Sequence, residues 1–158
     1  MTIMKKLLLL TVIVLAISAC KNKTEVKNNT VAAPKTVTLN PNTSIEKGCY
    51  RYSNGGSVVA MEITENENQV AGTLEIAYAE KDASKGTFAG TMNGDKLMAT
   101  YTFLSEGKVN TREIAYLLKN NQLIEGYAEM DEKGTKFKDT NAIEYTSTMP
   151  LSRVDCNQ

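Results

Sequence analysis

The sequence contains no histidine and no tryptophan, and only three of its 158 residues are prolines. Without histidine there is no imidazole to serve as a general base, complete a Ser-His-Asp triad or ligate a metal. The formal charge at pH 7 is zero, with 18 basic and 18 acidic residues, so no excess of positive charge favours nucleic acid. These absences predict a protein that is not an enzyme, has no metal or cofactor and binds no nucleic acid.

Long apolar runs are also missing. The longest such stretch, Leu7 to Ile17, has about eleven residues, contains one polar residue, Thr11, and follows Lys5 and Lys6. A membrane-spanning helix needs about 20 apolar residues, whereas about 7–15 are typical of the hydrophobic region of a signal peptide. The stretch ends in the tetrapeptide Ile17-Ser18-Ala19-Cys20.

This tetrapeptide resembles the lipobox of bacterial lipoproteins, in which small residues precede an obligatory cysteine. The resemblance implies that the signal peptide, residues 1–19, is cleaved before Cys20, which is then acylated on its sulfur and on its new amino group. Three acyl chains, each contributing about 0.8 kcal/mol per buried methylene, anchor a protein to a membrane firmly. The alternative is an ordinary signal peptide whose cleavage site merely adjoins a cysteine.

Residues 20–46 are polar, include Pro34 and Pro41, and show no apolar periodicity. Such a composition buries too little apolar surface to offset its ordering entropy. We therefore expect a flexible linker, with a reach of about 25–30 Å for about 25 residues, between Cys20 and a domain comprising residues 47–158.

Cys49 and Cys156 remain once Cys20 is assigned to the lipid. An exported protein folds in an oxidising compartment, so we expect these two cysteines to form a disulfide. The alternative is a pair of free or metal-binding thiols.

The domain consists of short alternating runs separated by Asn, Gly and charged residues, which predicts an all-β fold. The expected strands cover 48–53, 57–64, 69–80, 86–92, 96–104, 109–119, 122–130 and 142–148, with a short terminal segment near 151–155. Because consecutive antiparallel strands of this length leave unpaired edges unless the sheet closes, we predict a meander closed as an up-and-down barrel of about eight strands. The two cysteines would lie at the closing seam.

Short turns fix the expected register of the strands. A turn at Asn93-Gly94 would pair Gly90 with Leu97, and one at Asn66-Glu67 would pair Ile63 with Val70. Turns at Glu106-Gly107 and Asn120-Asn121 would pair Tyr101 with Arg112, Leu97 with Tyr116, Leu118 with Leu123, Tyr116 with Glu125, Ile114 with Tyr127 and Arg112 with Glu129. A longer loop at 81–85 would place Tyr78 opposite Phe88.

This register places Glu80, Gly86, Tyr101, Arg112 and Glu129 in one interior row near a barrel mouth, beside Tyr78 and Tyr127. Two interpretations remain open. Arg112 could offer its planar donors to a ligand carboxylate or phosphate between aromatic walls. Alternatively, Arg112 could form a structural ion pair with Glu129 and with Glu80, because buried charge requires a partner.

A catalytic carboxylate pair is not expected. Glu125 and Glu129 are four residues apart, which along a strand is about 13 Å, whereas the carboxyl groups of a glycosidase pair lie about 5–9.5 Å apart. On the outer face, Met98, Leu117, Ile124 and Met130 stand out as apolar residues and could form a docking patch.

The barrel resembles the lipocalin and avidin-like class in strand count, although the Gly-x-Trp signature of lipocalins is missing, so no binding residue is carried over. The layout of lipobox, linker and small β-domain resembles envelope lipoproteins of Bacteroidota, where acidic residues after the lipidated cysteine accompany surface display. Here Lys21-Asn22-Lys23 follows, so this resemblance implies an outer-membrane protein that faces the periplasm.

We therefore expect a monomeric, membrane-anchored, non-catalytic lipoprotein that binds a small molecule or an envelope-protein partner through the barrel mouth. The alternative is a structural or assembly module that acts through its outer face.

Overall fold

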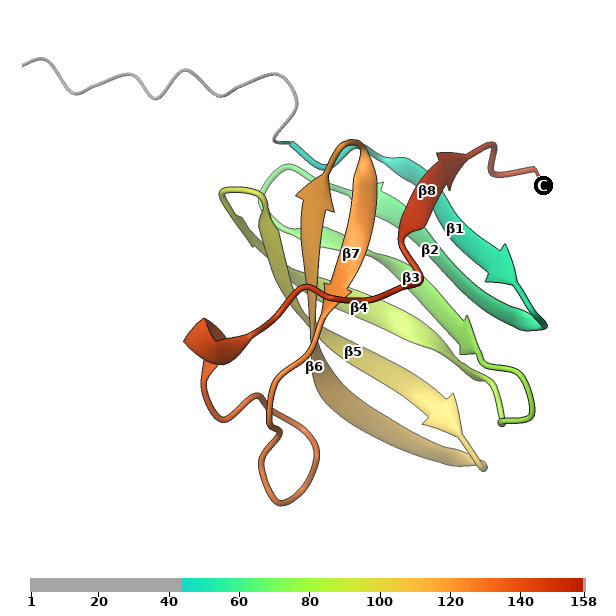
Figure 1. Cartoon of the computed structure of the whole chain (residues 1–158), viewed down its shortest axis with the longest axis vertical. Helices are drawn as coiled ribbons and strands as arrows, with labels where there is room; N and C mark the ends of the chain where they lie inside the picture. The colour runs from blue at the N-terminus through green and yellow to red at the C-terminus, as the bar shows by residue number, and fades with distance from the viewer. Residues whose placement is uncertain (1–43, 158) are drawn as a thin grey trace, which may run out of the picture. The chain divides into compact units, whose positions relative to one another are not determined.

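The computed structural model describes residues 44–157, and within them eight antiparallel strands close into a barrel in chain order (Figure 1). The strands are β1 (Gly48–Asn54), β2 (Ser57–Glu65), β3 (Val70–Ala77), β4 (Ser84–Asn93), β5 (Lys96–Ser105), β6 (Lys108–Lys119), β7 (Gln122–Gly126) and β8 (Leu151–Val154). The predicted up-and-down barrel is confirmed. Cys20, the signal peptide and linker residues 20–43 lie outside the described residues.

Every second side chain along the strands points inward, and these side chains fill the barrel interior. In β2, for example, Val59, Met61 and Ile63 are buried, whereas Glu62 and Thr64 between and after them are exposed. Side chains of successive strand residues point to opposite faces, so one set packs inside and the other meets solvent. The buried core includes Tyr50, Leu74, Ile76, Phe88, Leu97, Tyr101, Ile114, Tyr116, Leu123 and Leu151.

Inward-facing glycines mark places where neighbouring backbones approach closely, and Gly72 and Gly86 are two examples. A Cβ atom at Gly72 would lie 1.8 Å from the carbonyl oxygen of Glu62, and one at Gly86 would lie 1.9 Å from that of Thr102. Glycine inside a strand permits such close approach and lets a sheet bend sharply. These positions therefore help an eight-stranded sheet to close.

The predicted register is confirmed across β5, β6 and the first part of β7. Tyr101 pairs with Arg112, and Leu97 pairs with Tyr116. In the next ladder Tyr116 pairs with Glu125, and Leu118 with Leu123. The turns at Glu106-Gly107 and Asn120-Asn121 adopt positive φ at both central residues, as type I′ hairpins require.

Two other registers are wrong by two residues. Gly90 pairs with Ala99 instead of Leu97, because the turn residues are Gly94 and Asp95 and only Gly94 has a positive φ, which suits a type II′ turn. Ile63 pairs with Gly72 instead of Val70, because residues 66–69 connect β2 to β3 in place of the expected two-residue turn, and a bulge between Ile63 and Glu65 adjusts the last pairs of the ladder. A shift of two keeps every side chain on its predicted face.

The predicted strands 69–80 and 122–130 end early. β3 stops at Ala77, so Tyr78 lies beyond the ladder and Phe88 pairs with Gly72 instead. β7 stops at Gly126, and Tyr127 makes an isolated bridge to Glu144. The expected pairs Ile114–Tyr127 and Arg112–Glu129 are therefore wrong.

Residues 142–148, expected to form a strand, follow the short 3₁₀ helix η1 (Thr140–Ala142) and run beside the end of β7 (Figure 1), where Glu144 makes an isolated antiparallel bridge to Tyr127 and Ser147 N donates to Glu125 O. We call residues 142–150 the strap. Ile143 and Tyr145 pack against Gly126, where an added Cβ would lie 2.5 Å and 2.8 Å from their side chains. Their alternation with exposed Glu144 and Thr146 reflects an extended chain that bridges β7 only at Glu144 and forms no regular ladder with it.

β8 closes the barrel through three residue pairs with β1 and two with β7. The Cys49–Cys156 disulfide joins β1 to the residues that follow β8, with a Cα–Cα distance of 5.2 Å, so the predicted cysteine pair and its place at the seam are confirmed.

One end of the barrel, which we call the capped end, is closed by Ile45. This residue is 2% exposed, so the folded unit includes a residue that the sequence assigned to the linker. Its carbonyl oxygen accepts a hydrogen bond of 2.9 Å from Asn66 Nδ2, and Tyr50 Oη bonds to the backbone of Glu46. The polar groups that line this closure are thus satisfied within the chain.

Candidate functional site

Arg112 lies on the inner face of β6, at the end of the barrel opposite the capped end. Its guanidinium carbon is 5.9 Å from the centre of the Phe103 ring, which in turn stacks on Tyr101 with ring centres 4.7 Å apart. The Arg112 Nε atom is buried and has no hydrogen-bond partner among residues 44–157. Within the same residues Arg112 also takes part in no ion pair within 4.0 Å.

The chain after β7 builds one wall of this site. Residues 129–138, which we call the mouth hairpin, are held by Met130 bridging to Phe137 and by Asp131, whose carboxylate accepts hydrogen bonds from the Thr135 backbone and hydroxyl. Glu113 fastens the hairpin to β6, because its N–H donates to Thr135 O at 2.8 Å and its carboxylate accepts from Phe137 N at 2.9 Å. The hairpin thus stands where β7 would otherwise continue beside β6.

A cavity of about 170 Å³ lies between β6, the end of β7 and the mouth hairpin. Arg112 and Glu125 supply its two inward-facing charges, and Tyr78, Tyr127 and Phe137 supply aromatic surface. The remaining lining residues are Glu113, Ile114, Gly126, Ala128, Met130 and Gly134. The cavity therefore combines a cation, an anion and aromatic walls.

Glu125 is the only buried charged residue within 44–157, with 8% of its surface exposed. Burial raises the pKa of its carboxyl group above the ordinary value, while Arg112 and a hydrogen bond from Tyr127 act in the opposite direction. That hydrogen bond, from Tyr127 Oη to Glu125 Oε2, is 3.2 Å long. Glu125 and Arg112 thus interact electrostatically without direct contact.

The tyrosines around these charges are held in their neutral form. Burial, reinforced by the neighbouring Glu125 and Tyr127, raises the pKa of Tyr78 to about 12. Burial also raises the pKa of Tyr116 well above its ordinary value, and the Tyr116 hydroxyl has no hydrogen-bond partner in the described part of the chain. Neutral phenols at this end can donate hydrogen bonds to a ligand or to Glu125.

Three of the residues predicted for the mouth come together, since Arg112, Tyr78 and Tyr127 line one cavity. Tyr101 lies beside Arg112, but its hydroxyl is bonded to Leu74 O and Ser84 Oγ. Glu80 does not join them, because it is exposed and has a positive φ of 61° in the connection after β3.

Glu129 is also displaced from the predicted row. It is exposed on the mouth hairpin and forms an ion pair with Lys138. The structural ion pair between Arg112 and Glu129 is therefore wrong, and so is its extension to Glu80. The reason is that β7 ends three residues before Glu129, so the predicted alternation does not extend to it.

Sequence reasoning missed Glu125, Tyr116 and Phe137 as members of this site. The first two could have been found, because the confirmed pairing of Tyr116 with Glu125 places both inside the barrel, two inward positions along β6 from Arg112. Phe137 could not, because no strand pattern marks the mouth hairpin that carries it.

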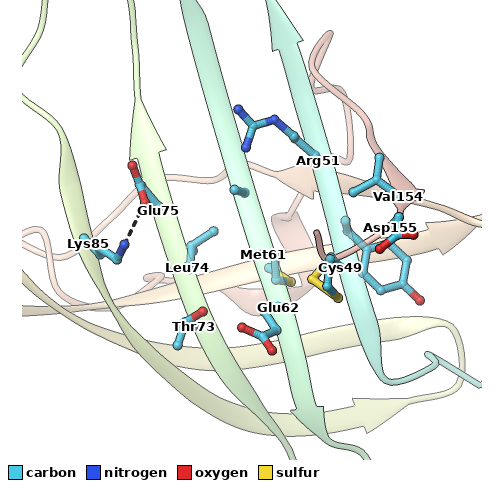
Figure 2. Close-up of a pocket in the computed structure, with 13 residues that line it drawn as sticks. Cys49, Arg51, Met61, Glu62, Thr73, Leu74, Glu75, Lys85, Val154 and Asp155 are labelled. Atoms are coloured by element: carbon cyan, nitrogen blue, oxygen red, sulfur yellow. Dashed lines mark ion pairs between the residues drawn. A yellow bond between two sulfur atoms is a disulfide. The ribbon is translucent and has the colours of Figure 1, made fainter. Parts of the chain in front are cut away.

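A second, larger cavity of about 350 Å³ lies on the outer face of β1, β2 and β3 beside the disulfide. Figure 2 shows Arg51, Glu62 and the Glu75–Lys85 ion pair around it, the ion pair with an N–O distance of 3.1 Å. Lys85 and Glu75 keep 75% and 41% of their side-chain surfaces exposed. Charges that are solvated or paired in this way need no ligand to stabilise them.

The predicted apolar patch on the outer face is partly covered by the chain itself. Met98 and Leu117 flank Ala115, which is fully buried although it faces outward, and the strap passes over this region. Tyr145 of the strap lies 5.5 Å from Lys96 Nζ, measured to the ring centre. Met130 belongs to the mouth hairpin and lines the Arg112 cavity instead.

Among residues 44–157, no three His, Cys, Asp or Glu side chains gather closely enough to hold a metal ion. No helix within the same residues has the length and apolar character needed to span a bilayer. No protein-family model, curated protein or solved structure matches this chain, so any functional argument rests on the site itself.

Proposed function

We propose that this protein is a non-catalytic, lipid-anchored lipoprotein of the bacterial envelope whose barrel binds a small anionic group at Arg112. Cys20 would carry the lipid, and the barrel would face the periplasm from the outer membrane. The anchoring part of the proposal is supported by the lipobox and the signal peptide alone.

The binding part rests on one observation, the unpartnered guanidinium of Arg112. Removing a cation from water is costly unless it is paired and hydrogen-bonded, yet this side chain has a buried Nε without a partner and no ion pair among residues 44–157. A carboxylate or phosphate would accept charge-assisted hydrogen bonds from it. The adjoining cavity gives such a group room to enter.

The chemistry around Arg112 favours binding over catalysis. Its neighbours are one carboxyl group and several tyrosines whose pKa values are raised, so none of the tyrosines is prepared to act as a base near neutral pH. A binding site requires only that these groups hold a ligand in place.

The experiment is a thermal-shift screen of small carboxylates and phosphates on the full chain in detergent. A ligand at 100 times its Kd stabilises the folded state by about 2.7 kcal/mol. We expect Arg112→Met to abolish this stabilisation, and with it the rise in melting temperature. Arg51→Met is the matched control, because it removes the same group from the outer cavity shown in Figure 2.

Loss of the shift in Arg51→Met with retention in Arg112→Met would contradict the proposal and assign binding to the outer face. Turnover of any substrate in a hydrolase panel would contradict its non-catalytic part.

A further inference from the structure

We infer that the ligand is a small zwitterion of amino-acid size, whose carboxylate binds Arg112 and whose ammonium group binds Glu125. This inference rests on the proposed function, because it takes Arg112 as the anion-binding group. It adds the second charge of the ligand and limits its size.

The two charges of the site are not paired with each other. Arg112 and Glu125 line the same cavity, yet they form no ion pair within 4.0 Å. Tyr127 occupies only Oε2 of Glu125, and Oε1 accepts no hydrogen bond from residues 44–157. The site therefore presents one free donor group and one free acceptor group to the same space.

Charge balance favours a zwitterion over a simple ion. A simple anion would satisfy Arg112 but would leave Glu125 beside a second negative charge, and a simple cation would have the reverse effect on Arg112. Like charges brought together in a buried site disfavour each other strongly. A zwitterion places an opposite charge against each group and adds no net charge to the cavity.

The volume of the cavity limits the size of the ligand. A cavity of about 170 Å³ equals the liquid volume of about five to six water molecules, at about 30 Å³ each. That space accommodates an amino acid with a short side chain, and Met130 and Phe137 offer apolar surface to it. Around the outer cavity of Figure 2, Glu75 and Lys85 are paired with each other, and no charged side chain that the structure describes there has a buried polar atom without a partner, so the same reasoning does not apply.

The test compares three probes that differ by one charged group, namely norvaline, pentanoate and butylamine, and then a panel of L- and D-amino acids with their deaminated analogues. The chain has only three arginines, Arg51, Arg112 and Arg153, so their Nε–H signals can be resolved and assigned by substitution in ¹H–¹⁵N spectra at pH 6. We expect at least one amino acid to shift the Arg112 signal saturably and to bind about tenfold or more tightly than its deaminated analogue, which corresponds to about 1.4 kcal/mol.

Two variants separate the inference from the proposed function. Glu125→Gln should retain binding of the deaminated acid and lose the preference for the amino acid, whereas Glu129→Gln, an exposed control already paired with Lys138, should leave both unchanged. If acids bind but no amino acid is preferred, the zwitterion inference is wrong and anion binding at Arg112 stands. If no acid in the panel shifts the Arg112 signal, both are wrong.

Discussion

The two ends of the barrel are built on opposite principles. At the capped end, the buried apolar side chain of Ile45 closes the barrel, and the polar groups beside it bond to one another within the chain. At the Arg112 end, the interior holds two charges, and two buried polar atoms, Arg112 Nε and Tyr116 Oη, lack partners within residues 44–157. Unsatisfied buried groups cost stability, and this contrast is the basis of our proposal that the Arg112 end binds a ligand.

The largest expected effect concerns the disulfide that fastens β8. Replacing both Cys49 and Cys156 with serine should lower the free energy of unfolding by about 4 kcal/mol, because the chain-entropy model gives about 4.7 kcal/mol for a closed loop of 100 residues and these cysteines are 107 residues apart. Urea denaturation measures the loss, and reduction of the wild-type protein should reproduce it. An unchanged midpoint would show that the seam holds without the bond.

At the capped end, Ile45→Ala should cost about 2 kcal/mol, the lower limit for truncating a buried isoleucine. The control at the other end is Val109→Ala, because Val109 is 74% exposed and such surface changes stay within about 0.5 kcal/mol. Urea denaturation measures the loss in free energy of unfolding for each variant. Equal losses would contradict the view that Ile45 closes one end of the barrel while the other end is open.

Glu125→Gln should stabilise the protein increasingly as the pH rises. The folded-state pKa of Glu125 is raised, mainly by burial, above an ordinary value of 4.5. The folded state therefore holds the proton more tightly than the unfolded state, and stability falls as the pH rises from the unfolded pKa through the folded one. Glutamine lacks this dependence. Melting temperatures of both proteins at pH 4 and pH 8 measure the effect, and a variant that is less stable only at pH 8 would contradict it.

The smallest expected effect compares one hairpin turn at each end. Asn120 and Asn121 turn with φ values of 53° and 60° at the capped end, where asparagine tolerates the left-handed region, but Glu106 adopts φ 49° at the other end. Glu106→Asn should stabilise the protein by about 0.5 kcal/mol, and Asn120→Glu should destabilise it by a similar amount. Urea denaturation measures both changes in the free energy of unfolding. Destabilisation by Glu106→Asn together with stabilisation by Asn120→Glu would show that turn strain does not distinguish the ends.

The sequence predicted the barrel well because several wrong details did not affect the faces of its strands. The misplaced turns near Gly94 and Glu65 each shifted the register by two residues, and a shift of two leaves inward side chains inward. The pairing of Tyr101 with Arg112 was correct because Glu106-Gly107 does form the turn between their strands.

The site was predicted only in part, because its walls lie where strand patterns end. Glu129 was assigned to the interior by extending the alternation of β7 past Gly126, where the chain instead leaves the sheet as the mouth hairpin. Ile143 and Tyr145 alternate as strand residues would, yet Glu144 between them makes only an isolated bridge to Tyr127, and no ladder forms. An alternation of apolar and polar residues indicates an extended, half-buried chain, but it does not identify the hydrogen-bond partners of that chain.

The central claim is that Arg112 is held for a ligand and not for the fold. The most direct test is the unfolding free energy of Arg112→Met in a Glu125→Gln background, so that no buried carboxylate is left behind. We predict a change within about 1 kcal/mol, because the buried Nε atom of Arg112 has no hydrogen-bond partner and the guanidinium has no ion pair in the described chain to lose. A loss of about 3–5 kcal/mol, the cost of breaking a buried ion pair, would contradict the account and make Arg112 a structural residue.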